Sequence, residues 1–215
     1  MQSVSDLSKL RAAIMGRVAD LRHVVQPVAA PLGSEDRRAI SYVTIELDNL
    51  IIGGLRQYTK SSLLGSRTCS GQRITASVKP KSTEEAAALI YASLNPAGYN
   101  KNGKPLAIKE KDEVTFRDPK RTEKVMTDYS ASNLPNLAVA LSLNAQVFGE
   151  LKTLRHFFAH RAQNTFEAVQ KFAVDRAIVG FETPEHLVVR GRPGTGVKLL
   201  DGWFAEIENF FDLAT

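Results

Sequence analysis

The chain has a single cysteine, Cys69, among its 215 residues, which excludes an internal disulfide and favours a reducing compartment. Its apolar runs are short and interrupted by charge or glycine. None approaches the roughly 20 residues that a membrane-spanning helix needs. Residues 1–6 lack the basic and then apolar order of a secretory signal. These absences predict a soluble, cytoplasmic protein without a membrane partner.

Positive charge is concentrated in the middle of the chain. Residues 60–124 contain 13 lysines and arginines against 7 aspartates and glutamates, whereas the remaining residues contain 15 against 16. Such an excess suits a polyanionic partner, because basic side chains release the counterions that surround phosphates. It is equally consistent with a solvated insertion, because no run of lysine or arginine within it is dense.

Apolar residues recur at spacings of three and four in two N-terminal segments. This pattern predicts amphipathic helices over residues 5–26 and 34–64, the first of which ends at Pro27. Gly53 and Gly54 lie inside the second helix, where they indicate a bend or a close contact with another helix.

The rest of the chain is also predicted to be helical. Further helices are expected over residues 83–94, 119–130, 133–178 with a break near Asn144, and 199–213. Proline, glycine and asparagine are frequent between them. We therefore expect a single all-α domain over residues 1–215, a helical bundle that contains a basic, less regular insertion at residues 65–118.

The segment 145–178 carries the chemically informative pattern. At about 100° per residue, its apolar side chains form one stripe that must face the core. Members of this stripe include Val147, Leu151, Leu154 and Phe158. The roughly opposite face is small or polar and consists of Gly149, Thr153, His156 and His160. We expect such a helix to pack on both sides, with another subunit as one partner.

Two of the four histidines, His156 and His160, lie on that second face at a spacing that makes them neighbours. Histidine is the side chain best suited to proton transfer near neutral pH. Arg155 adds a permanent cation that binds phosphate in a forked geometry. Together these groups suffice for RNA cleavage, in which histidine moves a proton and arginine stabilises the charge on the phosphoryl group.

The residues Arg155-His156-Phe157-Phe158-Ala159-His160 resemble the R-x4-6-H motif of the HEPN superfamily, and Arg161 extends the likeness. The resemblance implies an all-helical homodimer. It further implies a metal-independent endoribonuclease without a cofactor, similar to RiboL-PSP-type or related toxin and defence ribonucleases, with an antitoxin or defence-system protein as partner. By this resemblance the catalytic residues are Arg155 and His160, the supporting residues His156, Glu46 and Asn49, and the RNA-binding residues Lys152 and Arg161.

Other interpretations of these residues remain open. The two histidines could be hydrogen-bonded at a helix interface, and Arg155 could form a salt bridge to Glu46 or Glu150. Arg155 and His160 lie about 140° apart around one helix, so a catalytic site favours a dimer that brings two motifs together. A non-catalytic HEPN-like dimer that binds RNA or a partner protein is the alternative function.

Three further patterns are weaker. The two histidines could supply half a zinc site, but Phe157 occupies the position of the glutamate in an H-E-x-x-H motif, so no metal is expected. Residues 191–196 lack the lysine and hydroxyl residue that end a phosphate-binding loop, which indicates a turn. Cys69 has no histidine near it in the sequence, so we expect an inert thiol.

Overall fold

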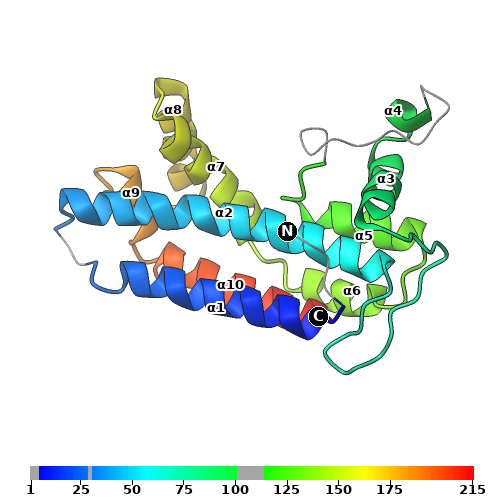
Figure 1. The fold of residues 1–215 in the computed structure, drawn as a ribbon. Helices are drawn as coiled ribbons and strands as arrows, with labels where there is room; N and C mark the ends of the chain where they lie inside the picture. The colour runs from blue at the N-terminus through cyan, green and yellow to red at the C-terminus, as the bar shows by residue number, and fades with distance from the viewer. Residues whose placement is uncertain (1–4, 29–30, 101–113) are drawn as a thin grey trace. The chain divides into compact units, whose positions relative to one another are not determined.

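The computed structural model describes residues 5–28, 31–100 and 114–215, and within them the regular structure is helical (Figure 1). The helices are α1 (Leu7–Val25), α2 (Ser34–Leu63), α3 (Thr83–Leu94), α4 (Pro96–Asn100), α5 (Pro119–Asp128), α6 (Leu134–Ser142), α7 (Val147–His160), α8 (Gln163–Asp175), α9 (Pro184–Val188) and α10 (Leu199–Ala214). The described β-type pairings are isolated bridges. The expected all-α fold class is confirmed.

The chain divides into two compact units. Unit 1 comprises residues 1–14, 51–144 and 210–215, and unit 2 comprises residues 15–50 and 145–209. Helices α1, α2 and α10 each contribute a segment to both units. The expected insertion at residues 65–118 belongs to unit 1, and its part from 101 to 113 lies outside the described residues.

The two units differ in charge. The sequence of unit 1 contains 16 lysines and arginines against 10 acidic residues, whereas that of unit 2 contains 12 against 13. The R-x4-6-H motif belongs to unit 2. The positive excess of the chain is therefore carried by the unit without the motif.

Side-chain caps explain where several helices begin. The Asp6 carboxylate accepts a hydrogen bond from the Ser8 N–H at 2.8 Å at the start of α1. Ser82 accepts from the Glu85 N–H at 3.2 Å before α3. Asp118 accepts from the Lys120 N–H at 2.9 Å before α5, with proline at the first helical position. Each cap satisfies a backbone donor that the helix itself leaves unpaired.

Unit 1 contains a close approach between α2 and α10. A Cβ added at Gly54 would lie 2.7 Å from Phe211 Cζ and 3.1 Å from Ile14 Cδ1. The expected close contact at the glycine pair is thus confirmed at Gly54. Farther along α2, Tyr58 and Ser62 accept hydrogen bonds from the buried Asn133 amide at 2.9 and 3.0 Å.

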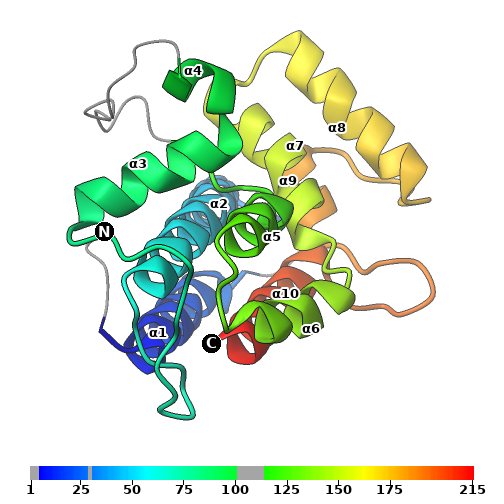
Figure 2. The same ribbon diagram turned by 90° about the vertical axis from the view of Figure 1, so that its right-hand side faces the viewer.

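Unit 2 differs from the sequence prediction at one point. The expected continuous helix over residues 145–178 is wrong, because the chain breaks after His160 and begins α8 at Gln163 (Figure 2). Arg161 has the left-handed φ of 46° and ends α7. Helix α8 then turns away and packs against α7. The predicted break near Asn144, which has φ 48°, is confirmed.

None of the helices within the described residues combines the length and the apolar character needed to cross a bilayer. The longest, α2, has polar or charged side chains along its whole length.

We expect Gly54→Ala to lower the midpoint of thermal unfolding, although alanine is the better helix former. The added methyl group overlaps the ring of the fully buried Phe211, and such overpacking typically destabilises by about 1–3 kcal/mol. Gly16→Ala on α1 is the matched control, because a Cβ there meets nothing within 4 Å. The control should be neutral or stabilising by up to about 1 kcal/mol. Equal midpoints for the two variants would contradict the packing argument.

Candidate functional site

Helix α7 carries the R-x4-6-H motif and is fixed by its apolar stripe. Val147, Leu151, Leu154 and Phe158 are buried, as the periodicity predicts. On the opposite side Gly149, His156 and His160 are exposed, and a Cβ added at Gly149 would meet nothing within 4 Å. One face of α7 is therefore packed within unit 2 and the other is open.

Three buried carboxylates form ion pairs on or beside α7. The first is Glu150, which lies in the N-terminal turn of α7. Its side chain is 2% exposed and accepts hydrogen bonds from Trp203 Nε1 at 2.7 Å and Arg192 Nη2 at 3.1 Å. Arg176 Nη2 lies 3.3 Å from its other oxygen. These partners compensate the desolvation of the carboxylate, which would otherwise be strongly unfavourable.

The second buried carboxylate, Asp48 of α2, pairs with the arginine of the motif. Arg155 Nε lies 3.7 Å from Asp48 Oδ2, with side-chain exposures of 34% for Arg155 and 1% for Asp48. This distance is that of an ion pair rather than a hydrogen bond. The expected alternative, a salt bridge of Arg155, is thus present, but the predicted partners Glu46 and Glu150 are wrong.

The third buried carboxylate, Glu185 of α9, pairs with the residue that follows the motif. Arg161 Nη2 lies 3.5 Å from Glu185 Oε1 and donates to Ser41 Oγ at 3.2 Å. The Glu185 side chain is 5% exposed and that of Arg161 is 57% exposed. Arg161 therefore combines a buried anchor with an exposed surface.

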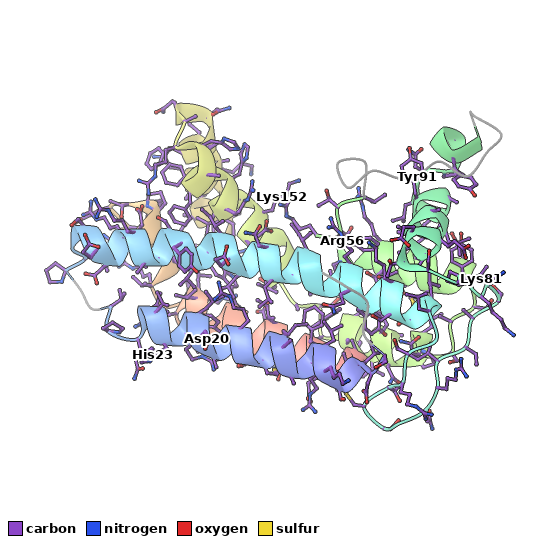
Figure 3. All side chains as sticks on the ribbon, viewed as in Figure 1. Asp20, His23, Arg56, Lys81, Tyr91 and Lys152 are labelled. Atoms are coloured by element: carbon purple, nitrogen blue, oxygen red, sulfur yellow. The ribbon has the colours of Figure 1, made fainter. Side chains whose placement is uncertain are left out.

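Between the two anchored arginines, the histidines face outward. The rings of His156 and His160 are in contact, with centroids 4.7 Å apart and an interplanar angle of 66°. Lys152, one turn earlier, is also exposed and is labelled in Figure 3. A cation and two imidazoles thus follow one another at spacings of four residues on the open face of α7.

The predicted supporting residues on α2 do not join this group. Glu46 accepts a hydrogen bond from Arg17 at 2.7 Å and another from the Asn49 amide at 3.1 Å. Tyr42 accepts from the same arginine at 3.1 Å. Glu46 lies two residues, or about 200° of helix rotation, from Asp48, the residue that reaches Arg155. The structure therefore places Glu46 and Asn49 on the α1 side of α2.

Asp48 and Glu185 are the residues that sequence reasoning missed. Asp48 shares a buried stripe of α2 with Ser41 and Thr44, which are also polar. An acidic residue on a helix face that is otherwise buried requires a cationic partner, and this pattern was the available signal. Glu185 offers no such signal, because it lies on a five-residue helix.

Unit 1 contains a separate, small surface hollow. Its lining residues are Arg56, Lys60, Ala87, Ile90, Tyr91, Val114 and Phe116. Arg56 and Tyr91 project from α2 and α3 in Figure 3. Within the part of the chain that the structure describes, no group of three or more histidine, cysteine, aspartate or glutamate side chains is placed to hold a metal ion.

Comparisons with protein-family models, curated proteins and solved structures gave no match to this chain. The relationship to the HEPN superfamily therefore stays a prediction from the motif.

We expect Glu150→Gln to destabilise the protein by about 2–4 kcal/mol, because two arginines lose their buried counter-charge. Glu167→Gln on α8 is the control, since Glu167 is exposed and contacts only Gln163 in the described hydrogen bonds. Urea unfolding of both variants measures the difference. Similar midpoints would show that Glu150 does not anchor α7.

Proposed function

We propose that the protein is a metal-independent endoribonuclease of HEPN type. The observation that carries the proposal is the open face of α7, where His156 and His160 are exposed in ring contact beside an arginine held by a buried carboxylate. A buried histidine pair would have no access to a substrate. The exposed pair has access, and the neighbouring arginine is the residue type that stabilises phosphoryl charge.

In the proposed reaction the 2′-oxygen of a ribose attacks the adjacent phosphorus, and the bond from phosphorus to the 5′-oxygen breaks. The proton of the 2′-hydroxyl passes to a base and the leaving 5′-oxygen receives a proton. His160 acts as the general acid or base, and His156 orients the substrate or the second imidazole. Arg155 clamps the phosphate, with Asp48 fixing the position of its guanidinium group. The products are a 2′,3′-cyclic phosphate and a 5′-hydroxyl.

We further propose that two copies of the chain form the site. Arg155 and His160 are about 140° apart around α7, so one straight helix does not direct both at one phosphate. A two-fold axis beside the open face brings Arg155 and His160 of two copies together. Gly149 on that face allows close approach because it has no side chain.

Cleavage should be lost on replacement of His160. Wild-type protein is expected to cleave RNA in the presence of EDTA, and His160→Ala should be slower by about 10²–10⁴-fold, the usual contribution of a positioned acid or base. His23→Ala is the matched control, because His23 is exposed on α1 (Figure 3). Cleavage rates and product ends are read by gel electrophoresis. Equal cleavage by wild type and His160→Ala would exclude the mechanism.

Gly149→Trp should block assembly without unfolding the chain. A Cβ added at Gly149 would meet nothing within 4 Å of its own chain, whereas an indole there would occupy the space that a second copy needs. Analytical ultracentrifugation should show a dimer for the wild type and a monomer for the variant, with cleavage lost. Gly16→Trp, at the equally open glycine of α1, should remain dimeric and active. A wild-type monomer that cleaves RNA would overturn the shared site.

A second function is favoured by one observation. Arg155 is already paired with Asp48, which is the arrangement expected if the arginine is structural. In this case the protein is a non-catalytic dimer that binds RNA or a partner protein. It would retain RNA with a steep dependence on salt and leave it intact.

A further inference from the structure

The corner that follows His160 has an unusual backbone. Arg161 adopts φ 46° and ψ 36°, and its N–H donates to the Phe157 carbonyl at 2.7 Å. The left-handed conformation is unfavourable by about 1–2 kcal/mol for a residue other than glycine. Ala162 and Gln163, which follow, are good helix formers, so local preference would continue α7 beyond His160. The Thr165 hydroxyl caps the start of α8, because it accepts from the Ala162 N–H at 3.1 Å and donates to the Ala162 carbonyl at 2.7 Å, and a tertiary contact holds Arg161 itself.

That contact is made by the Arg161 side chain. Its guanidinium group reaches Ser41 of α2 and Glu185 of α9, at 3.2 and 3.5 Å. Ser41 Oγ lies 3.5 Å from the same Glu185 oxygen and donates to the Arg37 carbonyl at 2.8 Å. Ser41 and Glu185 are both buried, with exposures of 7% and 4%. A buried carboxylate on another helix thus fixes the first residue after the motif.

We propose that Glu185 is a positioning residue for His160, acting through Arg161. The inference rests on the proposed function, since it assigns to Glu185 a role in the same site. His160 is the last residue of α7, so its backbone is held on one side by the helix and on the other only by the corner. Glu185 ends the helix at this residue and thereby determines where the imidazole lies relative to His156 and α8.

Two roles of Arg161, RNA binding and the positioning of His160, predict different kinetic effects. If its exposed surface only bound RNA, loss of the side chain would weaken substrate binding and raise KM. If Glu185 positions His160 through Arg161, the loss would lower kcat with little change in KM, because misplacement of a catalytic group by about 1 Å can reduce rate by about 100-fold. The split between kcat and KM therefore distinguishes the two.

The test uses the full-length protein with Glu185→Gln, which keeps the size of the side chain and removes its charge. We expect a decrease in kcat of about 10- to 100-fold with KM nearly unchanged. In a His160→Ala background the same substitution should have almost no further effect. Glu182→Gln is the control, because that side chain is 80% exposed beside the same helix. Unchanged kcat in a folded Glu185→Gln protein would overturn the inference.

Arg161→Gly is the second variant, in case Glu185→Gln unfolds. Glycine adopts the left-handed conformation without strain, so the backbone corner is retained while the link to Glu185 is removed. We expect folding to be preserved and kcat to fall as for Glu185→Gln. An increase in KM alone would assign Arg161 to RNA binding and contradict the positioning role.

An NMR measurement separates failure of this inference from failure of the proposed function. Imidazole resonances of His160, assigned with His160→Ala, should shift or broaden in Glu185→Gln, while those of His23 stay in place. His186 adjoins the substitution and is not informative. If the wild type does not cleave RNA, the proposed function fails but the resonances still test the positioning. Unmoved His160 resonances would overturn the positioning even in an active enzyme.

Discussion

The pairing of buried carboxylates with arginines is the interaction on which the arrangement of α7 depends. A carboxylate that is removed from water without a partner destabilises a fold by several kcal/mol, so each buried acid determines the position of a cation. Glu150, near the N-terminus of α7, pairs with Arg192. Asp48 pairs with Arg155, and Glu185 pairs with Arg161. Together with the buried apolar stripe, these three pairs fix the rotation of the helix about its axis. The histidines face outward as a consequence, since the anchored groups occupy the other side.

Much of the fold could be predicted from the sequence, because helix periodicity and capping are local. The spacing of apolar residues defined α1, α2 and α10 to within about two residues, the usual uncertainty of helix ends. The break between α7 and α8 could not be predicted in this way. It contains neither glycine nor proline, and its left-handed residue, Arg161, pairs with a buried acid that is remote in sequence.

In the candidate site, too, local features could be predicted from the sequence and contacts between remote residues could not. The motif was found from adjacent residues, and the apolar stripe correctly placed the two histidines on the open side of α7. The sequence offered Glu46 or Glu150 as the salt-bridge partner of Arg155, whereas the structure pairs it with Asp48. Two residues that are two positions apart on a helix point to nearly opposite sides of it. A salt-bridge partner that is chosen by residue type alone can therefore lie on the wrong side of the helix.

The uneven distribution of charge between the units has a kinetic consequence. Unit 2 is nearly neutral, and the positive excess belongs to the sequence of unit 1. If RNA is the substrate, as proposed, its long-range attraction would originate mainly outside the unit that bears the histidines, and it is screened over about 10 Å at 0.1 M salt. Under that proposal, the encounter with RNA and its cleavage would depend on different groups. Raising the ionic strength would weaken this attraction and slow the encounter, whereas the acid–arginine pairs, whose carboxylates are buried, are screened less.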